Sequence, residues 1–177
     1  MKILFISLGC DKNLADSEEM LGLLTGSGHE IVDSEEEAEA IVINTCCFIH
    51  DAKEESVNTI LEMAEYKKTG KCKALVVTGC MAQRYKEEIT QEIPEVDAVL
   101  GTTSYGDIVK ALNEVQAGHV FQEFRDINEL PEDSGRRVLT TGGHFGYLKI
   151  TEGCDKHCTY CIIPKVRGNY RLSLIHI

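Results

Sequence analysis

Short apolar runs alternate with helix-like stretches along the first part of this chain, and this alternation limits the folds that it can adopt. Four runs are apolar enough to be strands buried on both faces: Lys2–Leu8, Ala40–Thr45, Ala74–Thr78 and Val96–Leu100. Stretches with helical spacing of apolar residues separate these runs. Strands that alternate with helices imply a parallel sheet with right-handed crossovers. The sequence therefore predicts an α/β fold built on a parallel sheet.

Capping and breaking residues predict where the helices begin and end. Asp16 and Ser17 are suited to cap a first helix that stops at Gly26. Further helices are expected over residues 51–68, 83–93 and 105–115, and a short strand over residues 29–32. Pro94 would end the helix that precedes it.

Residues 118–146 differ in composition from the segment before them. They contain Pro131–Gly135, the pair Arg136-Arg137 and the run Thr140–Gly143, which together are typical of a linker. We therefore expect a first domain over residues 1–117, a linker over residues 118–146 and the start of a second domain over residues 147–177.

Charge and composition exclude some classes of protein. The 18 basic and 29 acidic residues give a formal net charge of −11, which repels phosphate backbones and argues against nucleic-acid binding by this portion. No run approaches the roughly 18 apolar residues of a membrane-spanning helix. The apolar start of the chain is too short for a secretion signal. The chain also has eight cysteines, and thiols in a reducing compartment often bind metal. We expect a cytoplasmic protein with no membrane contact.

Three cysteines follow the carboxyl ends of predicted strands. Cys10, Cys46 and Cys80 lie about one strand–helix–strand period apart. Ligands of open parallel sheets bind outside these strand ends, so the three thiols can meet there and hold a metal centre. The alternative is that they are small buried apolar side chains. Cys47 should face away from its neighbour, and Cys72 precedes its strand, so both are expected to be structural.

A second group of cysteines has the spacing C-x3-C-x2-C. Cys154, Cys158 and Cys161 come just after the apolar run Tyr147–Ile150, which we expect to be the first strand of the second domain. Three clustered thiolates can hold one metal centre and leave a coordination position open for a further ligand. A zinc site completed by His157, or three free thiols in a turn, is the alternative interpretation.

The second motif resembles the cluster loop of radical S-adenosylmethionine enzymes. The resemblance implies that Cys154, Cys158 and Cys161 hold three irons of a [4Fe-4S] cluster whose fourth iron binds S-adenosylmethionine, with Tyr160 beside the adenine. The protein would supply binding and orientation, while the cofactor supplies the chemistry. A reducing electron donor is then also required.

Both cysteine groups together resemble the methylthiotransferase family of these enzymes. The residues that carry the resemblance are Ser7–Asn13, Asp16–Glu18, Asn44–Cys46, Thr78–Cys80 and Leu148–Pro164. By this resemblance Cys10, Cys46 and Cys80 hold an auxiliary [4Fe-4S] cluster, so that the protein carries two clusters. The auxiliary cluster would deliver the sulfur of a methylthio group.

Asp11 and Lys12 distinguish two branches of that family. The run S-L-G-C-D-K-N resembles the branch that modifies an aspartate of the twelfth small-subunit ribosomal protein. The other branch acts on adenosine 37 of transfer RNA and usually has glutamine and methionine after the first cysteine. A non-catalytic iron-sulfur or zinc-binding module is a third hypothesis.

The family pattern stops near the end of the sequence. After Arg171 the chain reads Leu172–Ile177, which departs from the family motif. We therefore expect an N-terminal fragment with the start of a truncated radical S-adenosylmethionine barrel, last residues foreign to the family, and no turnover by the chain alone.

Overall fold

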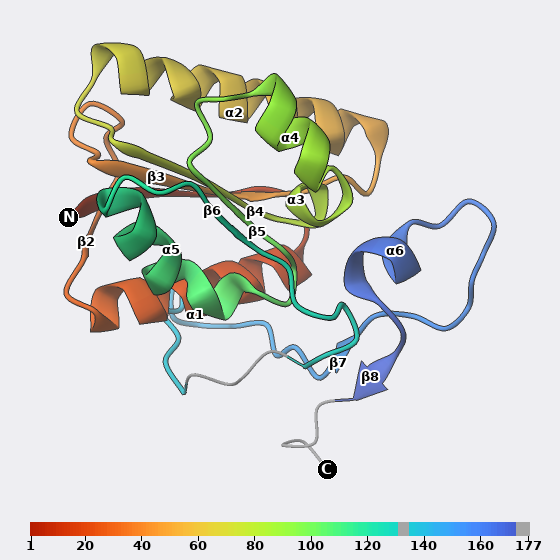
Figure 1. Ribbon diagram of the computed structural model, residues 1–177. Helices are drawn as coiled ribbons and strands as arrows, with labels where there is room; N and C mark the ends of the chain where they lie inside the picture. Colours follow the sequence, from red (N-terminus) through yellow and green to blue (C-terminus); the bar gives the residue numbers. More distant parts are fainter. Residues whose placement is uncertain (131–134, 173–177) are drawn as a thin grey trace.

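Parallel pairing of the apolar runs gives a six-stranded sheet with the order β2-β1-β3-β4-β5-β6. The computed structural model describes residues 1–130 and 135–172 (Figure 1). The strands are β1 Lys2–Ser7, β2 Glu30–Val32, β3 Ala40–Thr45, β4 Ala74–Gly79, β5 Ala98–Leu100 and β6 Phe121–Glu123. The predicted α/β class and parallel sheet are thus confirmed.

Helices cover both faces of the sheet (Figure 1). Their bounds are α1 Asp11–Gly26, α2 His50–Thr69, α3 Cys80–Arg84, α4 Lys86–Glu92, the 3-10 helix Tyr105–Asp107, α5 Ile108–Gln116 and α6 Ile163–Arg167. Helices α1 and α5 lie on one face, and α2 and α4 lie on the other (Figure 1). The chain changes direction across the sheet between β1 and β3, which is where parallel sheets place their ligand crevices.

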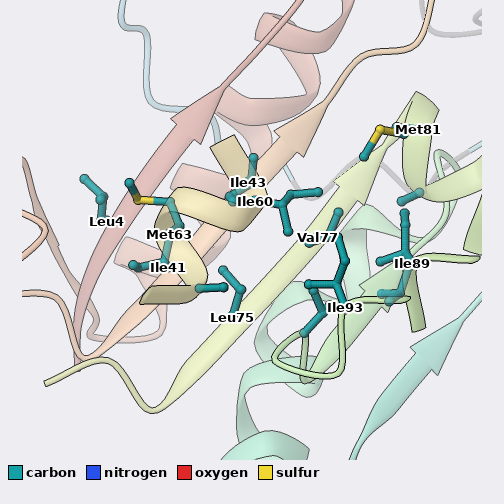
Figure 2. Close-up of a cluster of buried hydrophobic side chains, with 14 of the residues drawn as sticks. Leu4, Ile41, Ile43, Ile60, Met63, Leu75, Val77, Met81, Ile89 and Ile93 are labelled. Atoms are coloured by element: carbon teal, nitrogen blue, oxygen red, sulfur yellow. The ribbon is translucent and has the colours of Figure 1, made fainter. Parts of the chain in front are cut away.

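Two apolar layers hold the helices on the sheet. Figure 2 shows Ile60 and Met63 of α2 in one cluster with Ile41, Ile43 and Leu75 of the strands. The opposite cluster joins residues of α1 and α5 to the other side of the same strands; its members include Met20, Leu24, Val42, Val76, Ile108 and Leu112. Burying one such side chain contributes about 1.5–3 kcal/mol, so both layers stabilise the sheet edge that carries the cysteines.

Helix α1 begins earlier than the capping residues predicted. It starts at Asp11, and Asp16 and Ser17 lie inside it and are buried. Their side chains do not cap the helix because they bond to other elements: Ser17 meets the Ser7 hydroxyl at 2.7 Å, and Asp16 pairs with Arg167 at 2.6 Å. Asp16 and Ser17 therefore bind residues of other elements and do not cap the helix as predicted.

Two further elements differ from expectation. The helix predicted over residues 83–93 is divided into α3 and α4 at Tyr85, which leaves the helical conformation (φ −120°, ψ 34°) and packs its ring against the core. Strand β6 falls within the segment expected as a linker. It pairs with β5 through backbone bonds although only Phe121 is apolar in it.

The segment from residue 147 also differs from expectation. Residues 147–150 form no strand. Strand β7 is Thr151–Glu152 and pairs antiparallel with β8, Arg171–Leu172. Lys149 forms an ion pair with Asp16 of α1, so this stretch lies against that helix.

No barrel is seen among the described residues. Residues 131–134, which belong to the expected linker, and residues 173–177, which belong to the expected foreign end, lie outside the described part of the chain. Within residues 1–130 and 135–172 no helix is long and apolar enough to cross a membrane.

Candidate functional site

The three strand-end cysteines line one cavity. Cys10 follows β1, Cys46 follows β3, and Cys80 follows β4 as the first residue of α3. Strand β3 pairs with both β1 and β4, so the three strand ends are neighbours. The cavity has a volume of about 470 Å³, and Cys10, Cys46 and Cys80 all contribute to its lining. The sheet topology thus brings together residues far apart in sequence.

Two glycines allow the cysteine loops to approach each other. Gly9 has φ +93°, and a Cβ there would lie 2.6 Å from Cβ of Cys46 and 2.9 Å from its Sγ. Gly79 has φ +94°, and a Cβ would lie 2.5 Å from the carbonyl oxygen of Thr45. Residues with a Cβ rarely adopt such backbone angles and could not come this close. Each glycine directly precedes a cavity cysteine.

Buried polar side chains fix the loops around the cavity. The amide of Asn13 donates to the carbonyl oxygens of Leu8 and Thr45, each at 2.9 Å. Ser56 of α2 accepts from the N–H of Cys46 at 3.0 Å and donates to its carbonyl oxygen at 2.9 Å. Because Asn13 and Ser56 are fully buried, these bonds are shielded from competition by water.

Arg167 of α6 reaches the cavity from the far end of the chain. Its side chain is buried, and its Nε donates to Sγ of Cys80 at 3.3 Å. Its Nη1 donates to Asp16 at 2.6 Å and to Glu152 at 3.3 Å, while Nη2 donates to Oδ1 of Asn13. The guanidinium therefore connects α1, β7 and the start of α3 at one point.

Two basic side chains keep the buried carboxyl of Asp16 charged. Burial alone would raise the pKa of Asp16, but Lys149 and Arg167 outweigh it and hold that pKa below its ordinary value. Burial raises the pKa of the Cys80 thiol, although the adjacent Arg167 guanidinium opposes this effect. Lys12 completes the network: its Nζ donates to the carbonyl oxygen of Thr151 at 2.6 Å and lies 3.5 Å from Glu152.

Cys47 and Cys72 lie outside the cavity lining. Cys47 is buried in the core, where its Sγ donates to the carbonyl oxygen of Cys80 at 3.3 Å, and burial raises its pKa to about 11. Cys72 is buried just before β4, with its Sγ 3.4 Å from the carbonyl oxygen of Ala74. Both positions agree with the structural role that we expected.

The second cysteine group lies in the loop between β7 and α6. Cys158, Tyr160 and Cys161 line a second cavity of about 420 Å³. Cys154 is not in this lining; its N–H donates to the carbonyl oxygen of Gly168 at 3.1 Å. Tyr160 is 90% exposed, so its ring is free of protein contacts over most of its surface. Phe48 lines both cavities, which places the two cysteine groups on the same side of the molecule.

An iron-sulfur cluster requires thiolate donors close enough to share one centre. Among residues 1–130 and 135–172, no group of three or more His, Cys, Asp or Glu side chains is gathered closely enough to hold a metal ion. The first cavity nevertheless has three thiols in its lining and a volume of about 470 Å³. Thiolates are the ligands that iron-sulfur clusters use. The donor type of this cavity therefore fits such a cluster.

Comparison with known proteins gives the family. Residues 2–101, more than half of the chain, match the family described as "Uncharacterized protein family UPF0004". The chain belongs to this family. The part that matches the UPF0004 family contains β1 to β5 and therefore all three cysteines of the first cavity.

Similar curated proteins carry a more specific name. The chain is 66% identical over 171 residues to the ribosomal protein uS12 methylthiotransferase RimO of Lachnoclostridium phytofermentans, an alignment that covers 97% of this chain and 39% of that protein. The RimO of Clostridioides difficile is 50% identical, with 97% of this chain and 38% of that protein covered. The resemblance to methylthiotransferases is thus confirmed. The chain spans well under half the length of these relatives.

Sequence reasoning missed several residues that shape the site. Asn13, Lys149, Glu152 and Arg167 all belong to the buried network around Cys80. Asn13, Lys149 and Glu152 lie inside motifs that carried the resemblance, and this was the available signal. Arg167 gave none, because an arginine that directly precedes a glycine is typical of an exposed helix end.

Proposed function

We propose that this chain is the cysteine-bearing part of a radical S-adenosylmethionine methylthiotransferase that modifies an aspartate of ribosomal protein uS12. The observation that carries the proposal is the single cavity lined by Cys10, Cys46 and Cys80, beside a second cavity lined by Cys158 and Cys161. Methylthiolation of an unactivated carbon needs a sulfur source and a radical source within contact distance. Two thiol-lined cavities that share Phe48 support an arrangement of this kind.

The two cysteine groups have different roles in this proposal. Cys10, Cys46 and Cys80 hold the auxiliary [4Fe-4S] cluster, and Cys154, Cys158 and Cys161 hold the cluster that binds S-adenosylmethionine. When bound, these groups supply the methylthio sulfur and the radical. The chain's own residues orient the ligands: Asn13 and Ser56 fix the loops of Cys10 and Cys46, and Arg167 holds Cys80. In this proposal Tyr160, which is largely exposed and lines the same cavity as Cys161, stacks on the adenine.

The net charge of the chain and the names of its relatives favour a protein substrate over a nucleic acid. The relatives' names specify uS12, and the motif S-L-G-C-D-K-N agrees with that branch. A net charge of −11 favours a basic protein partner over a phosphate backbone. The reaction also needs a one-electron donor, and a reducing cytoplasm is the compartment in which free thiols and clusters of this kind persist.

A chimera tests the proposal. The first 171 residues of this chain replace the matching part of the Lachnoclostridium phytofermentans RimO, and the product is incubated anaerobically with uS12, S-adenosylmethionine and a reductant. We expect mass spectrometry to find one methylthio group in place of a hydrogen on an aspartate of uS12. The same chimera with Cys46→Ala should add none. Modification of transfer RNA instead of uS12 would contradict the assigned substrate.

A further inference from the structure

The Arg167 side chain and the backbone beside it contact both cysteine groups. The Nε of Arg167 donates to Sγ of Cys80 at 3.3 Å, and the carbonyl oxygen of the next residue, Gly168, accepts from the N–H of Cys154 at 3.1 Å. The guanidinium is also anchored by Asp16 and Glu152, so it is held in place from α1 and from β7. A short segment thus fixes the first cavity relative to the second cysteine loop.

Such a guanidinium has an electrostatic effect beyond packing. Reduction potentials of iron-sulfur clusters depend on net charge, on burial and on hydrogen bonds to the sulfurs. Residues that bond to metal ligands from outside tune the centre in this way. Arg167 is 4% exposed, so solvent screens its charge at Cys80 very little. The carboxylates of Asp16 and Glu152 act in the opposite sense and partly offset that charge.

We propose that Arg167 is a positioning residue that holds Cys80 and raises the reduction potential of the cluster bound at Cys10, Cys46 and Cys80. The inference rests on the proposed function, because it presumes a cluster at these cysteines. An N–H donor to Sγ of Cys80 withdraws charge from the sulfur, so the reduced and more negative form of the cluster is stabilised. Removing that donor lowers the potential, and removing the opposing Asp16 charge raises it.

A purely structural role is the competing explanation. A buried arginine with two carboxylate partners could serve only to dock α6, and its loss would then cost stability alone. Arg137 provides the matched control, since its Nε and Nη2 bond to the fully buried Glu18 of α1 at 2.9 and 2.5 Å. Arg137 is not in the lining of the cysteine cavity. Replacing either arginine by lysine keeps the charge and removes the forked hydrogen bonds.

The experiment is a dithionite titration followed by electron paramagnetic resonance. The chain carries Cys154→Ala, Cys158→Ala and Cys161→Ala, so that only the first cluster is observed, and R167K, R137K and D16N are added one at a time. We expect R167K to lower the midpoint potential by about 59 mV, a tenfold change in the one-electron equilibrium. R137K should leave the potential unchanged, and D16N should raise it.

Each outcome decides the inference. A folded, iron-loaded R167K protein with an unchanged potential would overturn it. If R167K does not fold or retain iron, D16N decides, because an unchanged or lowered potential there overturns the inference and a raised one supports it. An equal shift in R137K would assign the effect to general destabilisation. If the background chain takes up no iron and sulfide, the proposed function fails, and the inference fails with it.

Discussion

Cys46 and Cys47 are neighbours in sequence but lie in different environments. Cys46 lines the cavity, whereas Cys47 points into the core and bonds to the backbone of Cys80. The thiolate is the form that reacts and binds metal. Since burial raises the pKa of Cys47 to about 11, this thiol stays protonated at neutral pH. Chemical reactivity should therefore separate the two kinds of cysteine.

We predict that iodoacetamide at pH 8 labels Cys10 and Cys158 of the metal-free chain and leaves Cys47 unlabelled. Cys10 and Cys158 are exposed, while Cys47 is buried and protonated. Peptide mapping by mass spectrometry measures the extent of labelling at each site, and the urea-unfolded chain, in which all thiols react, is the control. Labelling of Cys47 at the rate of Cys10 in the folded chain would refute its assigned environment.

A buried carboxylate gives a prediction about acid. Burial would raise the pKa of Glu18, but hydrogen bonds from the Thr140 backbone and from Arg137 outweigh it and lower that pKa. A group whose pKa is lower in the folded state contributes stability above its unfolded pKa, about 4.3, and loses it as the pH falls through the folded value. The chain should therefore lose stability progressively below about pH 4.

The variant E18Q should show a shallower decrease of Tm with acid than the parent chain. At pH 7 it should be less stable by about 1–3 kcal/mol, because Arg137 loses its charged partner. Thermal unfolding by circular dichroism between pH 3 and pH 7 measures both effects. Parallel Tm profiles for the two proteins would show that Glu18 does not carry the acid dependence.

At the scale of elements, the turns between strands and helices determine where the cysteines point. Gly79 joins β4 to α3 at φ +94°, with the Thr45 backbone so close that a Cβ would clash. Gly118 has a similar φ of +85°, but no atom lies within 4 Å of the position that a Cβ would take there. The two glycines thus differ in crowding, and Gly79 also has ψ −161°, in a backbone region that is essentially restricted to glycine.

We predict that G118A costs about 1–2 kcal/mol of unfolding free energy, the cost of a left-handed conformation for a residue with a Cβ. G79A should cost at least about 2 kcal/mol more, because β3 and β4 must also move apart. Urea denaturation followed by circular dichroism gives both values. Equal losses in the two variants would mean that the close approach at Gly79 is not needed.

Some helices and strands could be recognised from the sequence and others could not, and the reason in each case is physical. Strands β3 and β4 are buried along their whole length and could be recognised as continuous apolar runs. Strand β6 has one apolar residue in three and is defined by pairing with β5, which no local pattern reveals. The early start of α1 was hidden because Asn13 and Asp16 are polar yet buried among tertiary partners.

The part of the candidate site that depends on sheet topology could be predicted from the sequence. Cys10, Cys46 and Cys80 could be placed together because parallel strands carry their carboxyl ends at one edge. The contact between Arg167 and Cys80 could not be predicted, because the two residues are far apart in sequence and Arg167 lies on a helix of only five residues. Long-range pairing of this kind leaves no periodic signal.

For the whole molecule, we propose that three distant thiols, which one sheet edge brings to a single cavity, hold an iron-sulfur cluster there. The most direct test is anaerobic reconstitution with iron and sulfide, followed by iron analysis and electron paramagnetic resonance of the reduced protein. The background is the chain with Cys154→Ala, Cys158→Ala and Cys161→Ala. The test variants are C10S, C46S and C80S, and the matched controls are C47S and C72S.

We predict about four irons per chain in the background and in both controls, as expected for one [4Fe-4S] cluster. Each of the three test variants should lose most of this iron and the spectrum of the reduced cluster. Full iron binding by C10S, C46S and C80S, or an equal loss in C72S, would contradict the cluster site at this sheet edge.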